Sequence, residues 1–123
     1  MTAVTLHLPW PPSVNDYWVG MGRGRHIGAR GKAFREEVFW IVRRARANGA
    51  FGERRLSVVI RCCEPMMKRR RDLDNLGKAT MDALKHAEVY ADDSQIDHLE
   101  LTRCEAGAGV LEVRISEWSP VSD

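Results

Sequence analysis

The chain has 123 residues, of which 44% are hydrophobic and 29% charged, and its formal net charge is +2. This length predicts a single domain, residues 1–123, whose core can form without disulfide bonds. The composition excludes a membrane span, because no apolar run approaches the roughly 18 residues that one requires, and we recognise no secretory signal. We therefore expect Cys62, Cys63 and Cys104 to be reduced thiols of a cytoplasmic protein.

The two halves of the chain carry opposite charge. Residues 1–71 contain 15 Lys and Arg against 5 Asp and Glu, whereas residues 72–123 contain 4 against 12. A basic half with clustered arginines indicates a polyanionic partner. The alternative is a folded surface on which both signs mix and cancel.

The first half of the chain predicts a strand, a loop region and a helix. Residues 4–10 alternate apolar and polar side chains, as a half-buried strand does. The prolines that follow predict a rigid, extended loop, and the glycine-rich basic stretch 19–32 predicts a loop that can contain a short hairpin. Residues 29–48 have the apolar spacing of a helix. The residues of its apolar stripe are Phe34, Val38, Ile41, Val42 and Ala45.

The second half predicts a strand, a helix and two further strands. Residues 55–63 alternate as a strand, and residues 74–87 have helical periodicity. Residues 96–104 and 110–118 read as two strands joined in a hairpin. The order is β-α-β-α-β-β, and we expect an α+β fold, a two-layer single domain in which a mixed sheet packs on two helices.

Two aspartates flank the start of the second predicted helix, directly after the arginines 69–71. Alternate residues of an extended segment point the same way, so the carboxylates of Asp72 and Asp74 can reach one point. One of them could simply cap the helix. Capping needs only one carboxylate, however, and two at close range repel each other. We therefore expect a cation between them, either an arginine or a metal ion.

A second acidic pair, Asp92 and Asp93, follows the same helix. Carboxylates without a nearby histidine or thiol form a hard, oxygen-only ligand set, which suits Mg²⁺ or Mn²⁺. Lys78 lies one turn after Asp74, where it could contact a phosphate. Asp82 and Lys85 continue this stripe, and for them a solvated row of intrahelical pairs is the simpler interpretation.

These segments resemble the RusA family of Holliday junction resolvases. The resemblance rests on "RRRDLDNLGKATMDAL" followed by "ADDSQI", together with "LPWPPSVNDYW" near the N-terminus, and it extends to the final "LEVRISEW". It implies a small homodimeric endonuclease that cuts four-way DNA junctions with Mg²⁺, or with Mn²⁺ in its place. The essential carboxylates of the family fall on Asp72, Asp74 and Asp93, and its essential lysine falls on Lys78.

The basic half supplies candidate DNA contacts. We expect arginine and lysine side chains to bind phosphates and to provide affinity rather than sequence reading, and the P-P-S-x-N segment of the family adds two polar residues. The candidates are Arg69, Arg70, Arg71, Arg23, Arg25, Lys32, Ser13 and Asn15. Three aromatic residues, Tyr17, Trp18 and Phe34, are candidates for stacking on unpaired bases.

The function that these observations predict is resolution of four-way junctions by paired symmetric nicks, in DNA recombination and repair, within a bacterial or phage-infected cell. A non-catalytic nucleic-acid-binding module and a small metal-dependent phosphohydrolase are the alternatives. Two symmetric nicks imply a homodimer. Its candidate interface is the first helix, with Phe34, Val38, Phe39, Ile41 and Val42, and the sheet edge is the rival.

Overall fold

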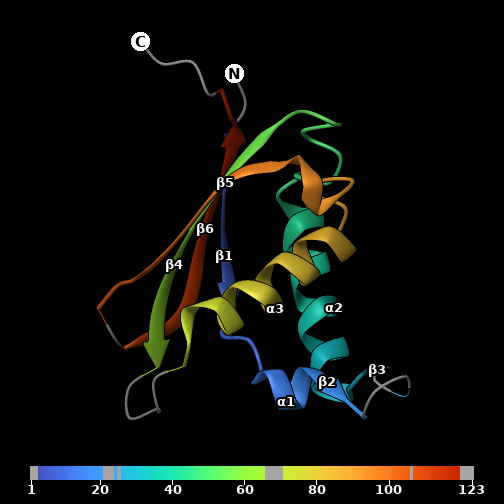
Figure 1. The fold of residues 1–123 in the computed structure, drawn as a ribbon, viewed down its shortest axis with the longest axis vertical. Coiled ribbons are helices and arrows are strands. Elements are labelled where there is room, and N and C mark those ends of the chain that lie inside the picture. The colour runs from blue at the N-terminus through green and yellow to red at the C-terminus, as the bar shows by residue number, and fades with distance from the viewer. Residues whose placement is uncertain (1–2, 21–23, 25, 66–70, 106, 120–123) are drawn as a thin grey trace.

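The computed structural model describes residues 3–20, 24, 26–65, 71–105 and 107–119, and it has two layers (Figure 1). A four-stranded sheet has the order β1-β6-β4-β5. Helices α2 (Ala29–Arg44) and α3 (Leu73–His86) cover one face of it. The strands are β1 (Ala3–Pro9), β4 (Leu56–Pro65), β5 (Ile96–Arg103) and β6 (Ala108–Glu117). The α+β class and the mixed sheet are confirmed, because β4 pairs with β5 in parallel and with β6 antiparallel.

The core forms between the inner face of the sheet and the two helices. Alternate residues of a strand point to the same face, which is why Val58 and Ile60 of β4 and Val113 of β6 are all fully buried. Phe34 and Val38 of α2 pack against them as helical spacing predicts. Phe34, Val38 and Val42 are core residues, so these three of the five proposed interface residues cannot form a dimer contact. Phe39 and Ile41 are half-buried, and their role in an interface stays a prediction.

The segment that joins β1 to α2 is more regular than its prolines predict. Residues Val14–Tyr17 form a short helix, α1, where we expected extended chain. The Ser13 hydroxyl accepts a hydrogen bond from the backbone N–H of Asp16 at 3.2 Å, as an N-cap does. The expected short hairpin is present, because β2 (Trp18–Val19) pairs antiparallel with β3 (His26–Ile27).

The predicted hairpin between the last two strands is wrong. Strands β5 and β6 do not pair, because β4 lies between them. Their short connection instead crosses the end of β4, where the backbone N–H of Gly107 donates to the Glu64 carbonyl at 2.6 Å. Gly107 has φ 136°, a conformation that glycine adopts readily. The glycines that signal a hairpin serve a strand crossover here.

The same strand order overturns the expectation of three free thiols. Cys63 and Cys104 form a disulfide with a Cα–Cα distance of 4.9 Å. Their pairing follows from the parallel ladder, in which Cys62 of β4 lies opposite Arg103 of β5. Cys62 remains a free, buried thiol. In the described residues, no helix is long and apolar enough to span a membrane.

A polar network ties the three helices together. Asp82 of α3 accepts two hydrogen bonds from Arg35 of α2, from Nε at 2.8 Å and from Nη2 at 3.0 Å. The hydroxyl of Tyr17, at the end of α1, donates to the same carboxylate. Asp82 therefore serves contacts between helices rather than the intrahelical row that its sequence spacing suggests.

Both tyrosines of the chain should resist ionisation in the folded state. Burial, followed by the hydrogen bond to Asp82, raises the pKa of Tyr17, and burial, followed by the charge of Asp93, raises the pKa of Tyr90. A group whose pKa is higher in the folded state stabilises the fold below its unfolded pKa, which is about 10 for tyrosine, and loses this contribution as the pH rises further. We expect the free energy of unfolding to fall above about pH 10.

An alkaline titration followed by absorbance and circular dichroism tests this expectation. Tyrosinate absorbance should appear together with the loss of helical signal. The Tyr17→Phe, Tyr90→Phe double variant should show a shallower decline in stability over the same pH range. Tyrosinate that forms near pH 10, the ordinary tyrosine pKa, in protein that stays folded would contradict the two buried hydroxyl environments.

Candidate active site

The start of α3 presents two acidic side chains to solvent. Asp72 is the N-cap residue, but its side chain makes no capping hydrogen bond. Asp74 lies in the first helical turn, where the partial positive charge of the helix end favours a carboxylate. Both residues are exposed. The capping interpretation of Asp72 is therefore not supported, and its carboxylate remains available for another role.

A pocket of about 410 Å³ opens beside α3, against β5 and the residues that precede it. Three of the four predicted catalytic residues line it, namely Asp74 and Lys78 of α3 and Asp93 of the 3-10 turn η2 (Asp93–Gln95). Asp93 follows the far end of α3, where its neighbour Asp92 contacts Lys85, and the chain returns along the sheet only after it, as β5. Asp72 is not among the residues that line this pocket.

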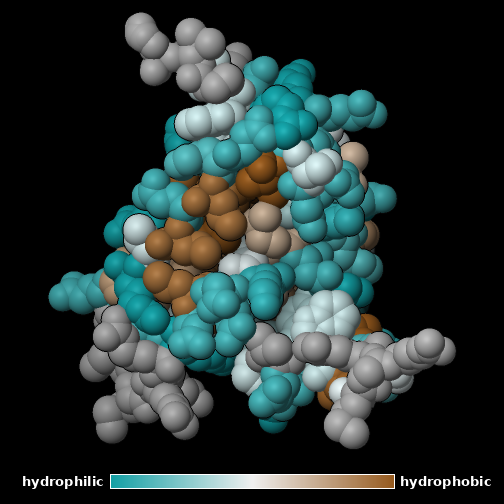
Figure 2. All heavy atoms as spheres, in the orientation of Figure 1, coloured by the Kyte–Doolittle hydropathy of each residue, from teal (hydrophilic) through white to brown (hydrophobic). Residues whose placement is uncertain are grey.

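Asp82 and Lys85 also line this pocket, together with three apolar side chains. Met81 of α3 and Leu99 and Leu101 of β5 line it, and Leu99 is 46% exposed. Figure 2 shows hydrophobic side chains gathered between the sheet and α3, surrounded by hydrophilic residues. Gly77 permits this close approach, because a Cβ atom there would lie 3.1 Å from a methyl group of Leu101. The carboxylates therefore border a partly apolar hollow.

The two aspartates of the second acidic pair have different environments. The Asp92 side chain accepts a hydrogen bond from the backbone N–H of Ser94 at 2.9 Å and lies 3.5 Å from the Lys85 ammonium. The hydrogen bond to Ser94 lowers the pKa of Asp92. Asp93 instead faces the pocket. Asp92 thus stabilises the turn, and Asp93 is the member of the pair whose side chain lines the pocket.

Two residues that we did not single out from the sequence hold this turn in place. Gln95 accepts from the backbone N–H of Asp92 at 2.9 Å and donates to the carbonyl of Arg54 at 2.9 Å, which anchors the turn to the start of β4. Tyr90 donates from its hydroxyl to the Met81 carbonyl of α3 at 2.9 Å. The D-x-x-Q pattern of a capping box was the available sequence signal for Gln95.

The donor set of this region fits a hard divalent cation. Carboxylate side chains of α3 and η2 line one pocket, and carboxylate oxygens are the ligands that Mg²⁺ prefers. Within the described part of the chain, no three His, Cys, Asp or Glu side chains gather closely enough to form a ready-made cluster. Convergence of Asp72 with Asp74 and Asp93 therefore stays a prediction.

The predicted DNA contacts have several different outcomes. Arg71 donates from Nη1 to the Pro11 carbonyl at 2.6 Å, and its guanidinium lies over the Trp10 ring. Burial lowers the pKa of the Arg71 guanidinium. Arg71 is half-buried and engaged with Pro11 and Trp10, and its contact with DNA stays a prediction. Lys32 and Asn15 are exposed, whereas Ser13 caps α1. Arg23, Arg25, Arg69 and Arg70 lie outside the described residues, and their contacts stay predictions.

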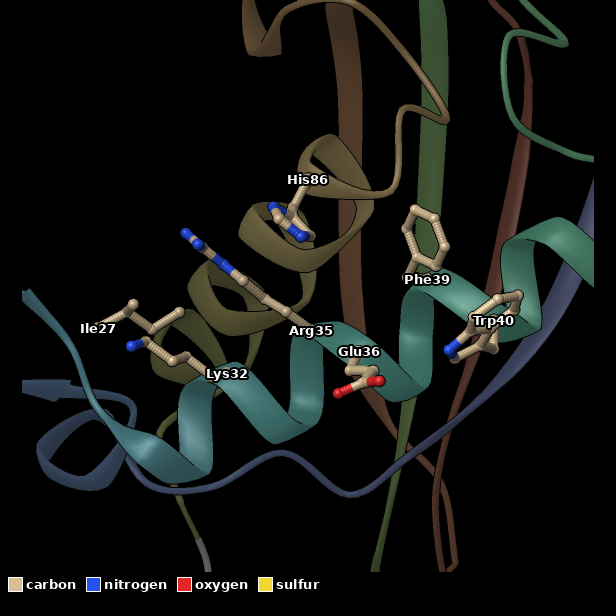
Figure 3. Close-up of a pocket in the computed structure, with 7 residues that line it drawn as sticks. All are labelled: Ile27, Lys32, Arg35, Glu36, Phe39, Trp40 and His86. Atoms are coloured by element: carbon tan, nitrogen blue, oxygen red, sulfur yellow. The ribbon is translucent and has the colours of Figure 1, made fainter.

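A second pocket, of about 420 Å³, lies along α2 (Figure 3). Lys32, Phe39 and Trp40 of α2 line it together with His86 of α3. Trp40 is 53% exposed, whereas Tyr17 and Phe34 are buried. Tyr17 and Phe34 therefore belong to the core, as most aromatic residues of a small domain do, and are no longer candidates for stacking on bases. Trp18 is half-buried, and its stacking role stays a prediction.

The comparisons with known proteins agree with this arrangement. A family model described as endodeoxyribonuclease RusA matches residues 9–116. The chain is 40% identical over 120 residues to the crossover junction endodeoxyribonuclease RusA of Shigella sonnei, and 39% identical to that of Escherichia coli K12, with 95% of this chain and 97% of each relative covered. A relative from Enterobacteria phage HK97 is 36% identical over 115 residues, or 93% of this chain and 94% of the relative. The chain belongs to the RusA endodeoxyribonuclease family.

Proposed function

We propose that this chain is a metal-dependent endonuclease that cuts four-way DNA junctions. The observation that carries the proposal is that Asp74, Lys78 and Asp93 line one pocket, in a chain of the RusA family. The relatives are named crossover junction endodeoxyribonucleases. The bacterial and phage sources of these relatives support a role in DNA recombination and repair in the cytoplasm of a bacterial or phage-infected cell.

Asp72, Asp74 and Asp93 are the residues that would hold Mg²⁺ or Mn²⁺. Such an ion neutralises the charge of a phosphodiester and lowers the pKa of a bound water. Asp82 is excluded from this set, because its carboxylate is already bound by Arg35 and Tyr17. The proposed ligands would come from the start of α3 and from η2.

Lys78 is the cation that we assign to the reacting phosphate. It lines the same pocket as Asp74 and Asp93, and no carboxylate of the described residues lies within ion-pair distance of it. Lys85, the other lysine of this pocket, is paired with Asp92. An ammonium in this position stabilises negative charge that develops on the phosphate or on the leaving oxygen.

A cleavage assay tests the proposed function. Labelled four-way junction and linear duplex of the same sequence are incubated with Mg²⁺, with Mn²⁺ or with EDTA. We expect cutting of the junction alone, with either metal, and no product with EDTA. Tight junction binding without cutting would favour a non-catalytic binding module. Hydrolysis of small phosphate esters without junction cutting would favour a phosphohydrolase.

The proposal includes a homodimer with two equivalent sites. A four-way junction in its open form has approximate two-fold symmetry. Each chain supplies one set of three aspartates, which is one active site for one nick. A closed two-fold dimer supplies two sites that are related by the same symmetry. We expect light scattering at micromolar protein to give twice the mass of one chain, which is 14.0 kDa. A monomer both with and without junction DNA would contradict paired nicking.

A further inference from the structure

One ion pair binds both backbone polar groups of Arg71, the residue before Asp72. Oε2 of Glu64 lies 3.2 Å from Nη1 of Arg103. The same oxygen accepts a hydrogen bond from the backbone N–H of Arg71 at 3.0 Å. Nη2 of Arg103 donates to the carbonyl of Arg71 at 2.6 Å. Both polar groups of this backbone are thus bound by side chains from the ends of β4 and β5.

Stability alone does not explain this ion pair. The side chains of Glu64 and Arg103 are only 9% and 26% exposed, so both charges lose much of their hydration. A buried ion pair can often be replaced by apolar residues of similar volume without loss of stability. What an apolar pair cannot provide is one acceptor and one donor directed at the peptide groups of Arg71.

The ends of β4 and β5, which carry Glu64 and Arg103, are cross-linked to each other. The disulfide joins Cys63 to Cys104, which are the neighbours of Glu64 and Arg103 in the sequence. The backbone N–H of Cys104 also donates to the Cys62 carbonyl at 3.1 Å. Arg71 is fixed a third time through its own guanidinium, which donates to Pro11. The chain therefore enters α3 from a closely defined position.

We propose that Glu64 and Arg103 are positioning residues of the nuclease site, which fix the Arg71 backbone and thereby the point from which Asp72 projects. The Asp72 side chain makes no capping hydrogen bond, so the backbone is what places it. Groups that orient metal ligands typically change metal affinity or activity by about 10–100-fold. This inference rests on the proposed function, in which Asp72 holds the metal ion.

A paired apolar substitution separates positioning from stability. In the Glu64→Leu, Arg103→Met double variant, the volume is kept and no unpaired charge remains. We expect a modest loss of resistance to urea, because the Arg71 N–H and carbonyl lose their side-chain partners, and an unchanged junction affinity in EDTA. Its Mn²⁺ affinity, measured by calorimetry without DNA, and its kcat at saturating junction should both fall by about 10–100-fold. The Glu64→Gln variant retains an acceptor for the Arg71 N–H and should keep most of the Mn²⁺ affinity and of the kcat that the double variant loses.

The Arg61–Glu112 ion pair, at 3.1 Å, supplies a matched control. Arg61 also lies on β4, but this pair is more exposed and does not contact Arg71. The Arg61→Met, Glu112→Leu variant makes the same chemical change and should leave Mn²⁺ affinity and kcat unaltered. In an Asp72→Asn background, the Glu64→Leu, Arg103→Met change should cost no further Mn²⁺ affinity, because the two effects share one target.

Three outcomes would overturn the positioning role. The double variant could bind Mn²⁺ and cut junctions as the unchanged protein does. It could lose stability, junction affinity and cleavage together, which would assign the pair a structural role. The loss of Mn²⁺ affinity in the double variant could also add fully to the loss caused by Asp72→Asn. A wild-type chain that cuts no junction would reject the proposed function instead, and the Mn²⁺ affinities would still decide the positioning role.

Discussion

Asp72→Asn should abolish junction cleavage and leave junction binding intact. Asparagine has nearly the same shape and is an equally good N-cap residue, so the fold and α3 should be unaffected. The substitution removes one negative charge from the proposed metal site. Because groups that merely support metal ligands already change activity by about 10–100-fold, we expect a loss of at least about a hundredfold for a ligand.

A gel-shift and a nicking assay on the same preparation test both parts of this expectation. Junction affinity should be equal or higher in the variant, because phosphate binding depends on the basic side chains and the variant repels DNA less. A thermal unfolding curve that matches the unchanged protein excludes a folding defect. Near-normal nicking by Asp72→Asn would remove this residue from the metal site.

The second acidic pair offers a sharper comparison, because its two members are adjacent and chemically identical. Asp93→Asn should reduce cleavage by at least about a hundredfold, for the same reason as Asp72→Asn. Asp92→Asn should cleave normally, because an asparagine oxygen can accept the hydrogen bond from Ser94 that Asp92 accepts. The variant also weakens the contact with Lys85, an exposed ion pair that contributes little to stability.

Initial rates of junction cleavage for the two variants, measured side by side at saturating Mg²⁺, decide between the aspartates. Each variant serves as the control for the other, since both remove one charge from the same exposed turn. An inactive Asp92→Asn with an active Asp93→Asn would reverse the assignment. Equal losses in both would indicate that the turn, rather than one carboxylate, is what cleavage requires.

The sequence was sufficient for those parts of the fold that depend on local periodicity. The buried faces of β4 and α2 follow directly from alternation at Val58 and Ile60 and from helical spacing at Phe34 and Val38. Strand order is a different matter, because it depends on pairing between distant segments. The glycines around Gly107 therefore suggested a hairpin, although β4 lies between β5 and β6. The Cys63–Cys104 disulfide was missed for the same reason, since the β4–β5 ladder creates it.

In the candidate site, too, local sequence signals identified some residues, and contacts between distant segments determined others. Asp74, Lys78 and Asp93 could be selected from residue type and spacing, and the structure brings them to one pocket. The role of Arg71 could not be selected in this way. As a member of an arginine run it suggested phosphate binding, yet it contacts Pro11 and Trp10. Its partners Glu64 and Arg103 are separated from it by 7 and 32 residues, and only the fold reveals them.

The measurement that tests the central claim most directly is a crystal structure of the protein with Mn²⁺ bound. The account predicts an ion at the start of α3, identified by anomalous scattering, with carboxylate oxygens of Asp72, Asp74 and Asp93 at about 2.0–2.6 Å from it. Lys78 should lie on the open side of the ion, where a phosphate would bind. An ion held elsewhere, or a bound ion with Asp93 turned away from Asp72, would contradict the proposed metal site.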